Sequence, residues 1–302
     1  MGKLFVIGNG FDLDHELETG YTDFLNYLKE DYQRSIFIDN IEKIVACYSY
    51  ELWSSFEKYL GNLNLDILLE SVMAERKAFN SEFDYEPLDE GHLIDHVISS
   101  HITSLHKLDE YVKGWIETIN LENVPPKRKY KHIFTKDSFF INFNYTNTLQ
   151  ELYGISHDKV FHIHGDVIDP IMGHGQDNHE QDFPTFETND IGINEFGSAI
   201  VSQVSEFYNN SRKDTHFFCR KMNDFIDYIN IEINEVCIIG HSLGEVDAVY
   251  FRELSYHYQD IPWTIYSRYS DQKGINKDKI QKLELLRQIN NQLHINVVPF
   301  KE

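Results

Sequence analysis

The stretch Lys3-Leu-Phe-Val-Ile-Gly-Asn-Gly-Phe-Asp12 places an apolar run directly before a glycine turn. Three later stretches share this form, an apolar run that ends in glycine, asparagine or histidine: residues 139–145, 160–165 and 236–244. Short apolar runs bounded in this way are typical of strands that a parallel sheet buries on both faces. In such sheets, ligands bind beyond the carboxyl ends of the strands, where the strand order reverses. The four stretches therefore predict one shared site, a nucleotide-type pocket.

The composition describes an acidic, aromatic-rich chain of 302 residues. Phe, Trp and Tyr make up 14% of it, which favours a folded core over intrinsic disorder. The 49 Asp and Glu residues outnumber the 27 Lys and Arg residues and give a formal net charge of -22. Because nucleic-acid phosphates need cationic partners, this balance disfavours nucleic acid as a ligand.

Cysteine usage and hydropathy exclude further classes of protein. Cys47, Cys219 and Cys237 are too few and too scattered for a disulfide framework or a zinc ribbon. No apolar run approaches the length of a membrane span, and the first residues lack the pattern of a signal peptide. We therefore expect a cytoplasmic protein that has no membrane partner.

Two further strand candidates, residues 263–266 and 295–298, bring the number of strands to six. Helical patterns separate the strands, so we expect an α/β fold with a Rossmann-like, mostly parallel sheet and large helical insertions, in a single domain over residues 1–302. The insertions span residues 20–125 and 190–232. Apolar spacing in the first predicts helices over 22–32, with Thr22 as the N-cap, and over 52–60, 66–73 and 89–119. We expect the insertions to form a helical subdomain that is either a lid or an oligomer face.

The Gly8-Asn9-Gly10 turn is the first candidate binding element. Glycines there permit a tight turn and let backbone N–H groups approach a phosphate or a ribose. The dinucleotide fingerprint G-x-G-x-x-G is incomplete, because Leu13 occupies its third glycine position, so a purely structural turn is the alternative. Asp12 is a candidate acceptor for ribose hydroxyls, and equally a candidate cap for the segment that follows.

Asn144 follows the second strand directly and is a candidate for chemistry. A short amide side chain at the carboxyl end of a strand can orient a water molecule or a ribose hydroxyl. Asn142 is the competing candidate, although its place within the strand suits a structural role. The alternative interpretation makes Asn144 a turn residue before an N-cap at Thr146 or Asn147.

His164 and Gly165 end the third strand. Histidine can act as a base near neutral pH, and a glycine beside it lets a substrate approach. The alternation His162-Ile163-His164 predicts that both rings lie on one face. The histidines and aspartates between Asp166 and Asp182 lack a recognised metal-ligand spacing, so we expect no bound metal.

The stretch Gly240-His-Ser-Leu-Gly244 fits G-x-S-x-G, the nucleophile elbow of serine hydrolases. That interpretation requires an acid and a later histidine, and only His257 or His294 follows. The rival interpretation is a glycine turn against a nucleotide, with Ser242 and Asp247 hydrogen-bonded to its ribose. The residues alone leave both interpretations open.

Taken together, the motifs resemble a known family. The stretches that carry the resemblance are Gly8-Asn-Gly-Phe-Asp-Leu13, Thr19-Gly-Tyr-Thr-Asp-Phe24, Trp53 with Phe56-Glu57, Phe143-Asn-Tyr145, His162-Ile-His-Gly165 and Gly240-His-Ser-Leu-Gly-Glu-Val-Asp247. In this order they are similar to the AbiH family of bacterial phage abortive-infection proteins. The chain departs from the pattern at Glu16 and Glu18, where we expect the family to carry Gly and Pro.

AbiH proteins in turn resemble distant sirtuin-type nucleotide-binding domains, and this likeness implies NAD as the ligand. Carried over by position, it implies that Asn144 and His164 are catalytic. The implied binding residues are Gly8, Asn9, Gly10, Asp12, Gly165, Gly240, Ser242 and Asp247. The paired-cysteine zinc module of sirtuin deacylases has no counterpart among the three cysteines. The implied function is therefore an antiphage effector that hydrolyses NAD⁺, its substrate, at the nicotinamide–ribose bond.

Three other functions remain open at this point: a nucleotide sensor without turnover, a serine hydrolase that uses Ser242, and a metal-dependent nuclease that uses the His/Asp loop. An effector that depletes NAD must be silent at rest. We therefore expect a phage-derived trigger, and we expect the chain to form a homo-oligomer.

Overall fold

The computed structural model describes residues 2–45, 48–64, 102–175, 191–269 and 271–300, together with the single positions 70, 74 and 95. Its contacts divide the chain into two compact units. Unit 1 comprises Met1–Gly20, Lys113–Ile171 and Asp214–Glu302, and unit 2 comprises Tyr21–Val112 and Met172–Lys213. Residues 113–125 and 214–232, which fall in the two predicted insertions, are thus grouped with the sheet in unit 1.

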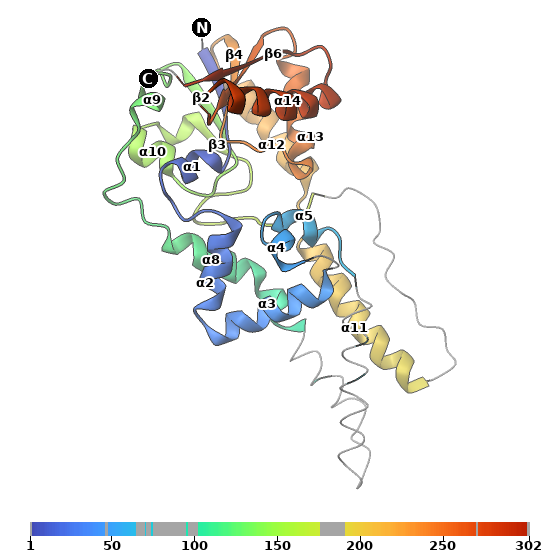
Figure 1. Cartoon of the computed structure of the whole chain (residues 1–302). Coiled ribbons are helices and arrows are strands. Elements are labelled where there is room, and N and C mark those ends of the chain that lie inside the picture. Colours follow the sequence, from blue (N-terminus) through green and yellow to red (C-terminus); the bar gives the residue numbers. More distant parts are fainter. Residues whose placement is uncertain are drawn as a thin grey trace. The chain divides into compact units, whose positions relative to one another are not determined.

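Unit 1 contains a six-stranded sheet in which every pair of neighbouring strands is parallel. Its strands are β1 (Gly2–Ile7), β2 (Ser138–Asn142), β3 (Val160–His162), β4 (Ile233–Ile239), β5 (Pro262–Ser267) and β6 (His294–Pro299). They follow the order β3-β2-β1-β4-β5-β6, which is typical of Rossmann folds (Figure 1). The predicted α/β class is confirmed, and each of the six predicted strands is present.

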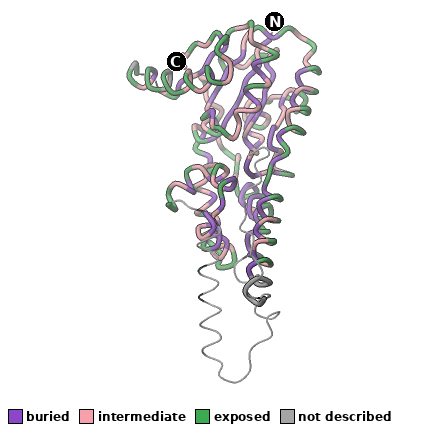
Figure 2. The backbone as a smooth tube through the Cα atoms, turned by 90° about the vertical axis from the view of Figure 1, so that its right-hand side faces the viewer, coloured by how far each residue is buried: buried purple, intermediate pink, exposed green. Residues whose placement is uncertain are grey.

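Alternate residues of the central strands face two different helix layers. Leu4 and Val6 belong to one apolar core, whereas Phe5 and Ile7 belong to the other. Figure 1 shows the two helix groups on opposite sides of the sheet, and Figure 2 shows the strands between them as largely buried. Burial on both faces explains why these strands are continuous apolar runs in the sequence.

Each layer of unit 1 is built from helices. The first core includes residues of α12 (Thr215–Tyr228), α13 (Ala248–His257) and α14 (Gln272–Ile289). The second includes residues of α1 (Gly10–Asp14), α9 (Arg128–Lys131) and α10 (Thr148–Tyr153). Two 3-10 helices, η3 (His157–Lys159) and η4 (Glu245–Asp247), precede β3 and α13. The side chain of Asp214 caps α12 by accepting a hydrogen bond from the Phe217 amide.

Unit 2 is helical, and its elements are shorter than apolar spacing predicts. The predicted helix over 22–32 is two helices, α2 (Tyr21–Lys29) and α3 (Tyr32–Ile44), because Asp31 caps α3 by accepting from the amides of Gln33 and Arg34. The predicted N-cap Thr22 was wrong, since it lies inside α2. The predicted helix over 52–60 is also divided, into α4 (Ser49–Leu52) and α5 (Phe56–Leu60).

The remaining described helices of unit 2 are α11 (Ile191–Asn210) and η2 (Leu105–Lys107), and α8 (Leu108–Thr118) runs across the sequence boundary into unit 1. The helix predicted over 66–73, and the first part of that predicted over 89–119, lie largely outside the described residues. Aromatic side chains fill the core of this unit: Phe24, Phe37, Trp53 and Phe56 are buried and lie in ring contact with one another.

A buried ion pair joins separate segments of unit 2. Nζ of Lys213 lies 2.5 Å from Oε1 of Glu57, and their side chains are 1% and 13% exposed. Oε1 also accepts a hydrogen bond from the Gly173 amide at 3.3 Å, and Oε2 accepts one from the Tyr21 hydroxyl at 3.0 Å. Because Tyr21 begins the first segment and Lys213 ends the second, Glu57 holds the ends of both segments together.

Candidate functional site

The candidate site lies at the carboxyl ends of β1, β2 and β4. The chain adds β2 and β3 on one side of β1 and then crosses to add β4, β5 and β6 on the other. The strand order therefore reverses between β1 and β4, where Rossmann-like sheets bind their ligands. The Gly8-Asn9-Gly10 turn follows β1 at this point, and Gly240-His241 follows β4.

The glycines let these two turns touch through their backbones. The Gly8 amide donates to the Ile239 carbonyl at 2.9 Å, and the Gly10 amide donates to the Gly240 carbonyl at 2.8 Å. A Cβ on Gly8 would lie 2.5 Å from Cα of His241, and Gly240 itself has a φ of +67°. Close packing thus explains the glycines. Their predicted contact with a ligand stays a prediction, and the amides of Gly8 and Gly10 are already bonded within the protein.

Asn9 ties the next loop to the glycine turn. Its Nδ2 donates to the Thr19 carbonyl at 2.8 Å, and its Oδ1 accepts from the Thr19 hydroxyl at 2.7 Å. Between them, Glu16 adopts a φ of 62°, the left-handed region that glycine enters without strain. Glu16, where we expect the family to carry glycine, is therefore a position where the backbone adopts the conformation that glycine favours.

Asp12 is completely buried on α1 beside β2. Its Oδ2 accepts a hydrogen bond from the Thr146 hydroxyl, which in turn lies 2.9 Å from the Thr148 hydroxyl. Burial raises the pKa of Asp12 to about 6, although Thr146, Thr148 and the amide of Asn144 partly oppose that rise. Within the described part of the chain, Oδ1 of Asp12 has no hydrogen-bond partner.

Asn144 lies between β1 and β3. Its Nδ2 donates to the Gly8 carbonyl at 3.3 Å, and its own carbonyl accepts from Nδ1 of His162 at 3.0 Å. Asn142, the competing candidate, closes the turn by accepting the Asn144 amide at 3.1 Å, which is a structural role. Oδ1 of Asn144 is buried and, among the residues that the structure describes, unpartnered. Within the described residues, Asp12 and Asn144 therefore each have one buried acceptor atom without a hydrogen-bond partner.

His164 forms the other half of the site. Its Nε2 lies 3.2 Å from Oδ1 of Asp247, and the ring is 4% exposed. Phe143 and Tyr250 pack edge-on against the ring, with centroids at 5.5 and 5.4 Å. Phe143 is the residue before Asn144, so the turn that carries one predicted catalytic residue contacts the other.

The second oxygen of Asp247 faces a residue that the sequence analysis did not single out. Nε2 of His241 lies 3.5 Å from Oδ2, and Nδ1 of His241 accepts the Leu243 amide at 2.8 Å. Burial lowers the pKa of His241 to about 4. His241 occupies the variable position of the G-x-S-x-G pattern, where its only signal was its residue type. Asp247, predicted to bind ribose, thus lies between two histidines.

The rings of His162 and His164 do not share a face, contrary to the prediction from strand alternation. His162 accepts a hydrogen bond from Gln150 of α10 at 3.0 Å, whereas His164 contacts Tyr250 of α13, in the opposite layer. The reason is that β3 ends at His162. Gly165 then turns the chain with a φ of +77°, where a Cβ would lie 2.0 Å from the Asp169 carbonyl oxygen.

Ser242 is exposed and does not sit on a nucleophile elbow. In that motif a helix begins directly after the serine, but here η4 and then α13 begin only at Glu245 and Ala248. The residues of this stretch with a positive φ are Gly240, at 67°, and Leu243, at 61°, and not Ser242. Of the two histidines that the hydrolase interpretation offered, His257 bonds to Asn223 and His294 is exposed at the start of β6.

The described residues contain no group of three or more His, Cys, Asp or Glu side chains that could hold a metal ion. In the His/Asp loop, His174 uses its Nε2 on the Tyr208 carbonyl at 3.0 Å, while Asp177, His179 and Asp182 lie outside the described residues. In the described part of the chain, no helix has the length and apolarity that crossing a membrane demands.

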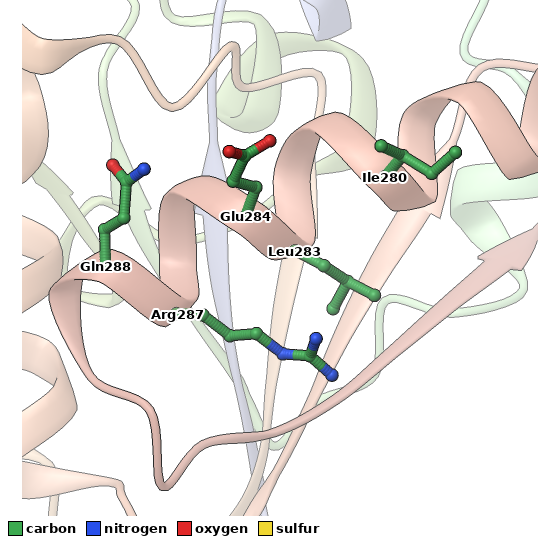
Figure 3. Close-up of a pocket in the computed structure, with 5 residues that line it drawn as sticks. All are labelled: Ile280, Leu283, Glu284, Arg287 and Gln288. Atoms are coloured by element: carbon green, nitrogen blue, oxygen red, sulfur yellow. The ribbon is translucent and has the colours of Figure 1, made fainter.

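A surface hollow of about 520 Å³ lies along α14, away from the candidate residues (Figure 3). Its five lining residues all belong to that helix: Ile280, Leu283, Glu284, Arg287 and Gln288. Leu283 and Arg287 point to one side of the helix, and Glu284 and Gln288 point to the other (Figure 3). Since none of them is a candidate site residue, this hollow does not mark the site.

A Rossmann-like sheet with buried polar side chains at its switch point defines the class of α/β proteins that bind ligands at the strand ends. Within that class, the family model described as "Bacteriophage abortive infection AbiH" matches residues 4–267. The chain therefore belongs to the AbiH family and is an abortive-infection antiphage protein. No curated protein and no solved structure matches it significantly.

Proposed function

We propose that this AbiH protein is an NAD⁺ hydrolase that cleaves the nicotinamide–ribose bond. The observation that supports the proposal is that, within the described residues, one buried acceptor of Asp12 and one of Asn144 have no hydrogen-bond partner at the switch point, while Phe143, the residue before Asn144, contacts His164. Such acceptor atoms can accept hydrogen bonds from ribose hydroxyls. Loss of NAD would halt phage replication together with the host, which is the outcome that abortive infection requires.

The charge of the site suits cleavage of a glycosidic bond. The bond between ribose C1′ and the nicotinamide nitrogen breaks with its electron pair on nicotinamide, and the ribose gains positive oxocarbenium character. With a pKa of about 6, the Asp12 carboxyl is mostly ionised at neutral pH. A fixed negative charge near the developing positive one lowers the energy of the transition state.

Asn144 would position the reacting groups, and His164 would accept a proton. Oδ1 of Asn144 would hold a ribose hydroxyl or the attacking water. His164 would accept the proton of that water as its oxygen bonds to C1′, which gives ADP-ribose, nicotinamide and one proton. Asp247 beside His164 would stabilise the ring once it is charged.

The other predicted binding residues would shape the pocket. Gly8, Asn9, Gly10, Gly165 and Gly240 would form a backbone floor against which NAD can lie closely. The exposed hydroxyl of Ser242 is available for a ribose.

The direct test is incubation of the protein, purified from phage-infected cells, with NAD⁺ and measurement of released nicotinamide. Asn144→Ala and His164→Ala should each lower the rate by at least about 100-fold, in the range expected for a lost catalytic group. His257→Gln, on the exposed face of α13, is the matched control and should keep the rate of wild type. Undiminished release in both alanine variants would remove the mechanism.

A nucleotide sensor without turnover is the second candidate. Asp12 and His164 are 0% and 4% exposed, and a site this closed suits retention of a bound nucleotide. Calorimetry with NAD⁺ and with ADP-ribose separates the two functions. A sensor binds one of them and releases no nicotinamide, whereas a hydrolase consumes NAD⁺ during the titration.

We also propose that a phage-derived component switches the protein on and that the active form is a homo-oligomer, because uncontrolled NAD hydrolysis would kill uninfected cells. Light scattering of the protein purified before and during phage infection tests this. A mass that stays at that of one 35.6 kDa chain while nicotinamide release begins would contradict the assembly step.

A further inference from the structure

We infer that His241 is a positioning residue: it fixes the Asp247 carboxylate so that this carboxylate orients His164, and of the two histidines His164 is the one that accepts a proton. The inference deepens the proposed function, on which the catalytic role of His164 rests. It goes beyond it by giving Asp247 a different task from ribose binding. It also identifies Nδ1 of His164 as the ring nitrogen that accepts the proton.

The hydrogen bonds of His241 determine its form. Its Nδ1 accepts the Leu243 amide at 2.8 Å, so that nitrogen carries a lone pair and not a hydrogen. In the neutral ring the hydrogen is then on Nε2, which lies 3.5 Å from Oδ2 of Asp247. Nδ1 of His241 is therefore hydrogen-bonded and Nε2 faces Oδ2 of Asp247 in a long contact, and protonating Nδ1 would break the bond to the Leu243 amide.

The surroundings keep His241 neutral. Phe143 and Phe251 pack against its ring with centroids at 4.4 and 4.8 Å, and this burial lowers its pKa to about 4. Lys282 of α14 and His164 lower it further, whereas Asp247 opposes them. A neutral donor on Asp247 leaves the negative charge of that carboxylate available to His164.

His164 is placed differently around the same carboxylate. Its Nε2 lies 3.2 Å from Oδ1 of Asp247 and donates to it, so the lone pair of the neutral ring is on Nδ1. The groups that face the ring include Asp247 of η4, Tyr250 of α13, Phe218 of α12 and Phe143. Asp247 is the charged group among these, and it favours the protonated ring. A carboxylate that holds one nitrogen of a histidine in this way fixes the tautomer and stabilises the imidazolium that forms.

The test measures the protonation of the two histidine rings directly and needs no NAD. Long-range ¹H–¹⁵N spectra of the full chain labelled in histidine should show the hydrogen of both rings on Nε2 at pH 7. His241 should stay neutral down to about pH 5. Asp247→Asn removes the carboxylate that Nε2 of His164 faces, so His164 should become a mixture of tautomers. A wild-type spectrum with His164 hydrogenated on Nδ1, or with His241 charged at pH 6, overturns the inference, even if no variant folds.

Two variants at His241 separate positioning from packing. His241→Phe removes the donor to Asp247, so His164 should become a mixture of tautomers and nicotinamide release should fall about tenfold. His241→Gln can still donate to Asp247 and should restore the single tautomer. An unchanged His164 tautomer in His241→Phe overturns the inference. Failure of the wild type purified from phage-infected cells to release nicotinamide, with the expected spectra, overturns the proposed function alone.

Discussion

Replacing Lys213 by methionine should destabilise unit 2 by about 3 kcal/mol, the lower end of the range for removing one member of a buried ion pair. Methionine keeps most of the aliphatic stem of lysine and removes the ammonium group. Glu57 then keeps two neutral donors, the Gly173 amide and the Tyr21 hydroxyl. Those donors, and the 13% exposure of the Glu57 side chain, are the reasons for choosing the lower end.

Hydrogen exchange followed by mass spectrometry is the suitable assay, because it reports each unit separately. At about 1.4 kcal/mol for each factor of ten, exchange of the amides in α5 should become about 150-fold faster, while exchange in the β1 and β4 strands serves as the internal reference. Lys58→Met, at an exposed lysine on α5, is the matched control and should change exchange less than about threefold.

A second variant tests the cause of the effect. Adding Glu57→Gln to Lys213→Met removes the uncompensated charge, so the double variant should be more stable than Lys213→Met alone. The reasoning is refuted if Lys213→Met changes exchange less than about tenfold. The reasoning is also refuted if Glu57→Gln destabilises the Lys213→Met variant as much as it destabilises the wild type.

Two further predictions concern the N-terminal turn. Glu16→Gly should stabilise unit 1 by about 0.5 kcal/mol in urea unfolding, because relief of left-handed strain slightly exceeds the entropy cost of glycine. Glu18→Gly is the control. A loss of stability in Glu16→Gly would contradict the claim that the Glu16 backbone is strained. Asp12 has a pKa of about 6 when folded and 3.8 as its reference, so the folded state binds the extra proton and stability should fall as pH rises from about 4 to 6. Asp12→Asn should reduce this loss of unfolding free energy by about 2 kcal/mol, measured from urea unfolding at pH 4.5 and at pH 7. An unchanged loss would refute the assignment of this pH dependence to Asp12.

The strands could be predicted from the sequence because burial on both faces leaves an unmistakable apolar run, as in Phe5 and Ile7 beside Leu4 and Val6. The helices of unit 2 were harder. The apolar spacing of Phe24, Leu25, Leu28 and Tyr32 continues across two helices. The break between them depends on Asp31, because its side chain caps the start of α3 and so favours a helix end over a continuous helix.

The candidate site was only partly accessible to sequence reasoning. Asn144 and His164 stand at strand ends, so the pattern alone brings them to one edge of the sheet. The role of His241 depends on the carboxylate of Asp247 and on the amide of Leu243, contacts that arise from an irregular turn. The side on which His162 lies depends on where β3 ends, which alternation does not reveal.

Because the turns after β1 and β4 touch through main-chain atoms, neither can move or lengthen without displacing the other. The separation between α1, which carries Asp12, and η4, which carries Asp247, is therefore set by backbone dimensions. Mutations elsewhere in unit 1 can alter its thermal stability yet leave this spacing intact. Engineering a wider or narrower ligand specificity would thus have to proceed through the loop around Ser242, whose side chain is exposed.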